Sequence, residues 1–175
     1  MEQVQPPYGY CDFARTSIPP DYREALGLVS IAWSCVEHTV EDAIRLLAGV
    51  DVRTAAILLT HASLPQRLDQ LLALATDRFA DDGVAHVKAL RDRVKSLVGT
   101  RNDLVHGNWF VEQSSGRVLV KKVKARGALR SDVRHYTADE ITQVARDTHA
   151  LSLDIFTCFD GVRRANNLTD ETVDE

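Results

Sequence analysis

The sequence has little of what marks exported and membrane-spanning proteins. It contains three cysteines, Cys11, Cys35 and Cys158, with no close pair, and residues 1–10 have neither a basic start nor an apolar stretch. Nowhere does an apolar run reach the ~18 residues that a membrane-spanning helix needs. These absences predict a cytoplasmic protein with reduced thiols, without an export signal and without a membrane partner.

The motifs of metal-dependent and phosphate-binding enzymes are missing as well. The six histidines show no His-Glu-x-x-His spacing, the nine glycines are scattered, and no Gly-x-Ser-x-Gly sequence is present. We therefore expect no metal and no cofactor. A net charge of −4 argues against a protein that coats nucleic acid without specificity, because that binding needs many cationic side chains.

The remaining composition is that of an ordinary globular domain. Apolar residues make up 45% of the 175 residues and charged residues 26%, which is enough to bury one core. Four of the five prolines lie in residues 1–20, which predicts an extended arm there. We expect a single domain over 21–162 and a polar tail over 163–175.

Apolar residues at alternating spacings of three and four predict an all-α fold, an antiparallel bundle of four to five helices. Ser63 and Pro65 interrupt one of these patterns, so that segment is either a kinked helix or two short helices. The capping signals and glycines place the helical segments at about 21–49, 51–62 with a continuation beyond Pro65, 84–106, and 137–161.

Before the last helix the period changes, and a β-hairpin is expected at about 108–124. Residues 117–135 carry seven basic side chains and one acidic one. One interpretation is that the hairpin docks an RNA backbone and that an aromatic residue stacks a base. The other is that the charges protect a solvated edge and the aromatic residue anchors the hairpin. The residues concerned are Trp109, Lys121, Lys122, Lys124 and Arg126.

The segment 101–107, Arg-Asn-Asp-Leu-Val-His-Gly, closes the helix predicted over 84–106. The apolar stripe of this helix, extended forward, predicts that Arg101 faces inward. A buried guanidinium requires a carboxylate partner, an oligomer interface or a cleft for an anion. Glu37 and Glu41 border the stripe of the first helix and are the candidate partners, Glu37 being preferred; the alternative for both is a solvated helix face.

Asn102 and His106 are four residues apart and therefore share a helical face, where the amide can bond the imidazole. The long stem of Arg101 allows all three side chains to converge at the helix end, where Gly107 is expected in a left-handed conformation. Such a constellation is either a functional site or a buried polar network that locks the helix end.

An arginine followed directly by asparagine, with histidine four residues later at the end of a bundle helix, resembles the signature of the HEPN superfamily. The resemblance implies a helical bundle, frequently a homodimer, whose active members are metal-independent endoribonucleases. By position it implies Arg101 and His106 as the catalytic pair, supported by Asn102.

The resemblance also implies a toxin or defence component that a partner such as an antitoxin holds in check. Other members bind nucleotides or proteins without cleaving RNA. We therefore carry two hypotheses from the sequence: an RNA-cleaving dimer, and a non-catalytic module that binds a protein, a nucleotide or RNA.

Overall fold

The computed structural model describes residues 18–112, 115–126 and 128–165 of the chain. Helices dominate, and a small antiparallel sheet with strand order β1-β2-β3 precedes the last helix. The elements are α1 (Pro20–Ala48), α2 (Val52–Leu59), α3 (Leu64–Arg78), α4 (Asp81–His106), β1 (Asn108–Val111), β2 (Val118–Arg126), β3 (Ala128–His135) and α5 (Ala138–Ala165).

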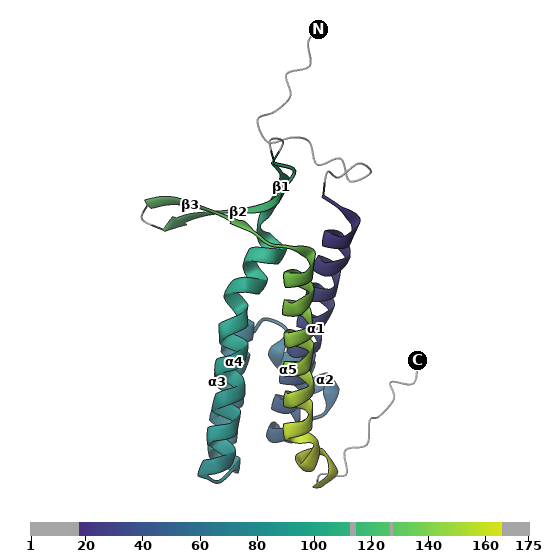
Figure 1. The fold of residues 1–175 in the computed structure, drawn as a ribbon. Coiled ribbons are helices and arrows are strands. Elements are labelled where there is room, and N and C mark those ends of the chain that lie inside the picture. The colour runs from purple at the N-terminus through teal and green to yellow at the C-terminus, as the bar shows by residue number, and fades with distance from the viewer. Residues whose placement is uncertain (1–17, 113–114, 127, 166–175) are drawn as a thin grey trace.

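The long helices form a bundle with the sheet at one end (Figure 1). Helices α1 and α5 lie side by side and run in the same direction, and α4 runs back toward the sheet. The predicted helical class is thus confirmed, but the expected antiparallel arrangement is wrong for α1 and α5, which pack in parallel because the sheet returns the chain to the end where α1 begins. None of the helices in the described part of the chain is long and apolar enough to cross a membrane.

The buried apolar side chains form two groups. The main cluster fills most of the bundle, from Trp33 on α1 to Phe159 on α5. The end cluster lies next to the sheet and is much smaller. On α4, Leu97 packs against the main cluster and Leu104 belongs to the end cluster, so Arg101 lies where the two separate. The end cluster consists of Ala25, Val29, Leu104, Ile141 and Ala145.

The helix boundaries follow from local capping chemistry. Gly49 ends α1 in a left-handed conformation (φ 68°), which costs glycine little. The Asp51 carboxylate accepts from the Thr54 amide (2.9 Å) and caps α2. The Ser63 amide donates to the Gln66 side-chain oxygen (2.8 Å) and starts α3. The break that the sequence left open is therefore a boundary between two separate helices.

Several predicted boundaries are wrong: α2 ends at Leu59 instead of near 62, and α4 begins at Asp81 instead of near 84. The hairpin expected over 108–124 is only the first part of the sheet, because β2 continues to Arg126 and pairs with a third strand. Helix α5 does not stop at Gly161 but runs to Ala165, since Val162 packs on the main cluster and Arg163 pairs with Asp42. Residues 1–17 and 166–175, most of the predicted arm and tail, lie outside the described residues.

Candidate functional site at the end of α4

Residues 101–106 end α4, Gly107 is the C-cap, and β1 begins directly after Gly107. The expected left-handed conformation of Gly107 is wrong: its φ is −75° and its ψ is 153°, which is extended backbone. Glycine is required here for space. A Cβ atom would lie 2.1 Å from Val120 Cγ2 and 2.4 Å from the Asp103 carbonyl oxygen. The helix therefore ends by turning straight into the sheet, which crosses over its last residues.

Trp109 attaches the sheet to this helix end. Its indole N–H donates to the Leu104 carbonyl oxygen (2.8 Å), one of the acceptors that a helix C-terminus leaves without a helical partner. The half-buried ring packs on the end cluster, and its centroid lies 6.5 Å from that of Tyr136. Of the two interpretations of Trp109, the structure shows the anchor.

Asp103 makes a second attachment. Its carboxylate, whose side chain is 13% exposed, pairs with Lys122 and lies 3.5 Å from an Arg134 guanidinium nitrogen. A hydrogen bond to Tyr136, and to a smaller extent one to Asp132, raises the pKa of Arg134, which keeps this arginine cationic. Lys122 therefore links β2 to α4.

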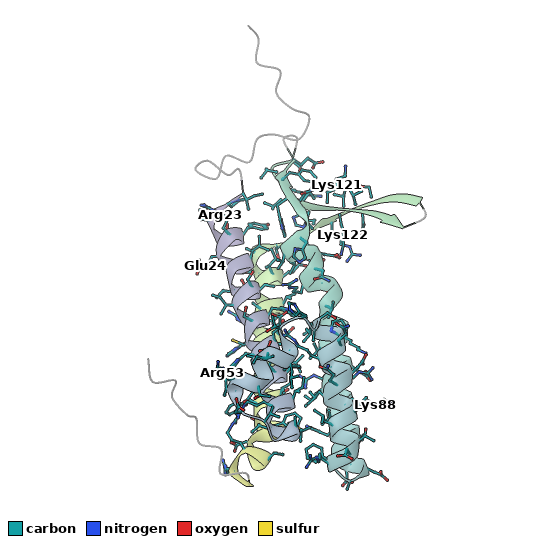
Figure 2. All side chains as sticks on the ribbon, turned by 180° about the vertical axis from the view of Figure 1, so that it is seen from behind. Arg23, Glu24, Arg53, Lys88, Lys121 and Lys122 are labelled. Carbon is teal, nitrogen blue, oxygen red and sulfur yellow. The ribbon has the colours of Figure 1, made fainter. Side chains whose placement is uncertain are left out.

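The other cationic residues expected to contact RNA are placed differently. Lys121 is half-buried at the root of the sheet, next to Lys122 in sequence (Figure 2). Lys121 pairs with Asn108 across the strands, and opposed residues of neighbouring strands share a face of the sheet. Because adjacent residues alternate in direction, Lys121 points to the face opposite Lys122. The side chains of Lys124 and Arg126 lie outside the described residues.

Arg101, Asn102 and His106 converge as predicted, with the arginine at the centre. Arg101 Nη1 lies 3.0 Å from Asn102 Oδ1 and 2.9 Å from His106 Nε2. The guanidinium thus bonds both neighbours, in place of the expected bond between the amide and the imidazole. Arg101 and Asn102 are half-buried, whereas His106 is exposed at the helix end.

This geometry defines the state of His106. A guanidinium can only donate hydrogen bonds, so His106 Nε2 must be the acceptor. The imidazole is then neutral, with its proton on Nδ1, because a protonated ring has no lone pair to offer. In the structure the arginine occupies the nitrogen that a general base would use.

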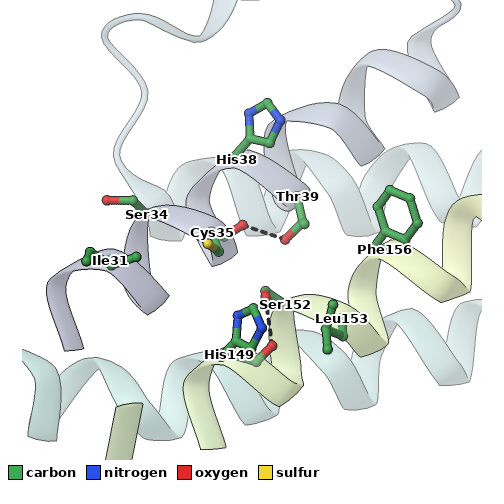
Figure 3. A pocket seen from close by; sticks show the side chains of 9 residues that line it. All are labelled: Ile31, Ser34, Cys35, His38, Thr39, His149, Ser152, Leu153 and Phe156. Carbon is green, nitrogen blue, oxygen red and sulfur yellow. Dashed lines mark hydrogen bonds between the residues drawn. The ribbon is translucent and has the colours of Figure 1, made fainter. Parts of the chain in front are cut away.

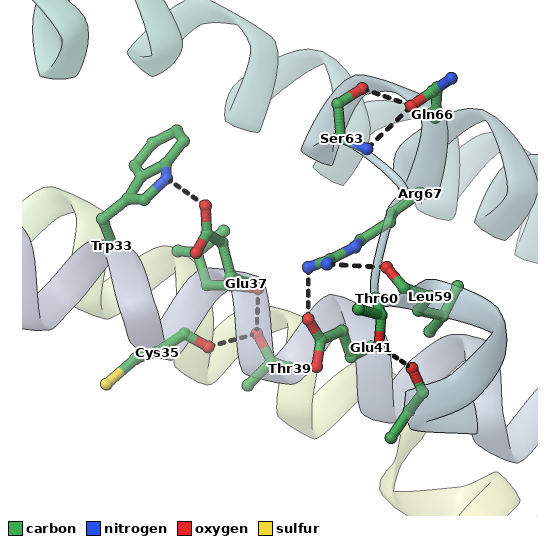
Figure 4. Close-up of polar contacts among 12 residues, drawn as sticks. Trp33, Cys35, Glu37, Thr39, Glu41, Leu59, Thr60, Ser63, Gln66 and Arg67 are labelled. Atoms are coloured by element: carbon green, nitrogen blue, oxygen red, sulfur yellow. Dashed lines mark hydrogen bonds and ion pairs between the residues drawn. The ribbon is translucent and has the colours of Figure 1, made fainter. Parts of the chain in front are cut away.

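Neither candidate glutamate forms an ion pair with Arg101 within the described residues. Glu37 accepts a hydrogen bond from the Trp33 indole nitrogen (2.9 Å), and Glu41 pairs with Arg67 (Figure 4). Arg101 instead places its Cζ atom 5.4 Å from the centroid of the Trp33 ring. Sequence reasoning missed Trp33 as a site residue because an aromatic residue in an apolar stripe is ordinarily core.

Within the described residues, Arg101 therefore contacts only neutral groups, which sets it apart from other arginines of the bundle. Arg45, Arg67 and Arg163 have side chains that are 13–14% exposed, and each pairs with a carboxylate. Arg101 is stabilised by a π face, an amide oxygen and an imidazole nitrogen. A half-buried cation without a counter-ion is the arrangement expected of an anion-binding group.

A separate apolar groove of about 500 Å³ lies between α1 and α5 (Figure 3). It includes His38, His149 and Phe156 but no residue of the 101–107 segment. Over the described residues, no group of three or more His, Cys, Asp or Glu side chains is placed to hold a metal ion.

No protein-family model, curated protein or solved structure matches the chain. The likeness to the HEPN superfamily therefore depends on the Arg-Asn-x-x-x-His spacing and its place at the end of a bundle helix.

Proposed function

We propose that the chain is a metal-independent endoribonuclease of HEPN type, in which Arg101 binds the scissile phosphate and His106 transfers a proton. The observation that carries the proposal is the bond between Arg101 and His106. It joins a cation that has no counter-ion among the described residues to an exposed imidazole at 2.9 Å. Phosphate is the anion that a planar guanidinium fork recognises well.

RNA supplies the nucleophile for this chemistry. His106 Nε2 accepts the proton of a 2′-hydroxyl, and the 2′-oxygen forms a bond to the adjacent phosphorus while the bond to the 5′-oxygen breaks. The leaving 5′-oxygen takes a proton from a second acid, and the product ends in a 2′,3′-cyclic phosphate. Arg101 stabilises the negative charge that develops on the phosphoryl oxygens.

The observed geometry implies an order of events. Before RNA binds, Arg101 occupies the lone pair of His106 Nε2. A phosphate oxygen, being anionic, is a stronger acceptor for a guanidinium than a neutral imidazole is. Substrate binding would therefore draw Arg101 away from His106 and free Nε2 to act as a base only when RNA is present.

A homodimer would complete this site. One imidazole fills one role at a time, so a second proton donor is needed for the leaving oxygen. A two-fold axis that brings two α4 ends together would supply the second imidazole and a second guanidinium. Light scattering on the purified chain tests this part, because a strict monomer with full activity contradicts a composite site.

The test of the proposed function is cleavage of mixed RNA by the purified chain in the presence of EDTA. We expect cleavage with 2′,3′-cyclic phosphate ends, lost in His106→Ala. The matched control is His149→Ala, which removes another exposed histidine from α5. Equal and negligible cleavage by the wild type and His106→Ala contradicts the proposal.

The second candidate is a non-catalytic module, and one observation favours it: the polar groups of the segment already bond one another or the sheet. Asp103 holds Lys122, and Arg101 holds Asn102 and His106. If these bonds serve only to lock the helix end, Arg101→Ala and His106→Ala should unfold the protein or lower its melting temperature strongly. Near-native melting with loss of RNA cleavage supports the enzyme.

A further inference from the structure

We propose that Trp33 is a positioning residue of the Arg101–His106 pair, an inference that rests on the proposed function. Trp33 lies on α1, and Arg101 and His106 lie on α4, which runs in the opposite direction (Figure 1). Trp33 is 4% exposed and belongs to the main cluster. The Arg101 guanidinium carbon lies 5.4 Å from its centroid, within the range of a cation–π contact.

The contact compensates for what Arg101 lacks. Its Nε atom is buried and has no hydrogen-bond partner, and within the described residues no carboxylate pairs with it. The π face of Trp33 is thus the group that stabilises the buried side of the guanidinium. Meanwhile Nη1 remains directed at Asn102 and His106.

Glu37 fixes the ring itself. The indole N–H donates to Glu37 Oε1 at 2.9 Å, between residues one helical turn apart on α1 (Figure 4). Hydrogen bonding to an anion polarises the indole and makes its face a better acceptor for a cation. Glu37 therefore acts on Arg101 through Trp33, which differs from the direct ion pair that the sequence predicted.

A second cation–π contact in the bundle shows why this one is special. Arg163 places its Cζ atom 4.2 Å from the Phe156 ring centroid, but it also pairs with Asp42 and Asp160. Loss of Phe156 would leave Arg163 held by carboxylates. Among the described residues, loss of the Trp33 face would leave Arg101 with two neutral partners, both on its own helix, and the side chain could adopt other rotamers.

The experiment observes the ring nitrogens of His106 by NMR in the ¹⁵N-labelled full chain. At a pH where the ring is neutral, we expect the wild type to show the tautomer with the proton on Nδ1. Its signals are assigned by their loss in His106→Ala. Trp33→Leu should shift the tautomer toward the Nε2-protonated form that free histidine favours, and should lower kcat for RNA cleavage by roughly tenfold or more. Trp33→Phe should lie between.

Phe159→Leu is the matched control, because Phe159 belongs to the same main cluster but makes no contact with Arg101. It should leave the tautomer and kcat unchanged. If Trp33→Leu does not fold, Trp33→Phe and Glu37→Ala decide: each should shift the tautomer in part. A wild-type tautomer and kcat in every folded Trp33 and Glu37 variant overturns the inference.

The two proposals can fail separately. If the wild type cleaves no RNA, the proposed function fails, but the tautomer still shows whether Trp33 holds Arg101 against His106. If RNA is cleaved in a His106-dependent way and the His106 tautomer is unchanged in the Trp33 variants, only the positioning role fails.

Discussion

Arg67 on α3 and Arg101 on α4 are both half-buried arginines that reach across to α1, and they meet different chemistry there. Arg67 pairs with Glu41 and donates to the Leu59 carbonyl oxygen at 3.0 Å. Arg101 rests against Trp33 and bonds neutral groups of its own helix end. Arg67 links three helices, whereas Arg101 keeps its charge available.

The two arginines also differ in the size of the apolar core beside them. Arg67 lies on α3, whose buried face packs into the main cluster, while Arg101 borders the small end cluster and an exposed histidine. Removing one partner of a partly buried ion pair leaves the other charge uncompensated, so Arg67 is expected to matter for stability. A charge without a counter-ion at the edge of a small core contributes little to stability, which is a reason to look for function there.

The largest effect is expected from Arg101→Met in the RNA cleavage assay. Removing the guanidinium takes away the phosphate contact, so kcat should fall by about 10³-fold. Because Arg101 forms no ion pair within the part of the chain that the structure describes, the free energy of unfolding should change by no more than about 1 kcal/mol, the size of a modest cation–π contact. Urea unfolding checks this. A greater loss of stability than in Arg67→Met would reverse the comparison.

Gly107→Ala should damage the site through the fold. Its Cβ would meet Val120 Cγ2 and the Asp103 carbonyl oxygen at distances that no relaxed structure tolerates. We expect a loss of about 2–3 kcal/mol in unfolding free energy from this overpacking. Gly99→Ala on the same helix, where the added Cβ meets nothing within 4 Å, is the control and should be neutral or stabilising. Equal stability of the two variants would contradict the close approach.

Arg67→Met is to be compared with Arg101→Met. It leaves Glu41 without its partner and the Leu59 carbonyl oxygen without a donor. Since the Glu41 side chain is 39% exposed and can recover water, the expected loss in unfolding free energy is about 1–2 kcal/mol. RNA cleavage per folded molecule should stay at the wild-type level. A large loss of cleavage here would remove the distinction between the two arginines.

The smallest expected effect is on the stability of the fold at acid pH, through two carboxylates that cap helices. Glu140 begins α5 at the site end, and Asp51 begins α2; bonding to the backbone amides of Thr137 and Thr54 lowers the pKa of each carboxyl. A lowered pKa stabilises the fold above the ordinary carboxyl range, and this stabilisation is lost as the pH falls through the lowered value.

Glu140→Gln and Asp51→Asn should each flatten the acid side of the plot of melting temperature against pH, by roughly 1–2 °C. Thermal melts from neutral pH downward check this. An acid limb as steep as that of the wild type in either variant would show that the cap does not contribute.

Much of this molecule follows from periodicity and capping. The stripe of apolar residues on α4 correctly predicted that Arg101 faces inward. Helix boundaries marked by Gly49, Asp51 and Ser63 are confirmed by the structure. These features are local, because they depend on residues at most one turn apart.

The features that sequence reasoning missed depend on contacts between distant elements. Trp33 and Arg101 each fit a helical stripe, but nothing in one chain segment says that they meet. Gly107 was assigned a cap conformation because Val120, the residue that excludes a Cβ, lies across the sheet. Strand β3 was missed because charged residues interrupt the apolar alternation that marks a strand.

The chain has two tryptophans, and both contact the last two turns of α4. Trp33 faces Arg101, and Trp109 bonds the Leu104 carbonyl oxygen. Tryptophan fluorescence therefore reports on the surroundings of the last turns of α4, whereas far-ultraviolet circular dichroism reports on the whole bundle. A change in emission without a change in ellipticity would measure local opening at the end of α4, and the molecule needs no added label to show it.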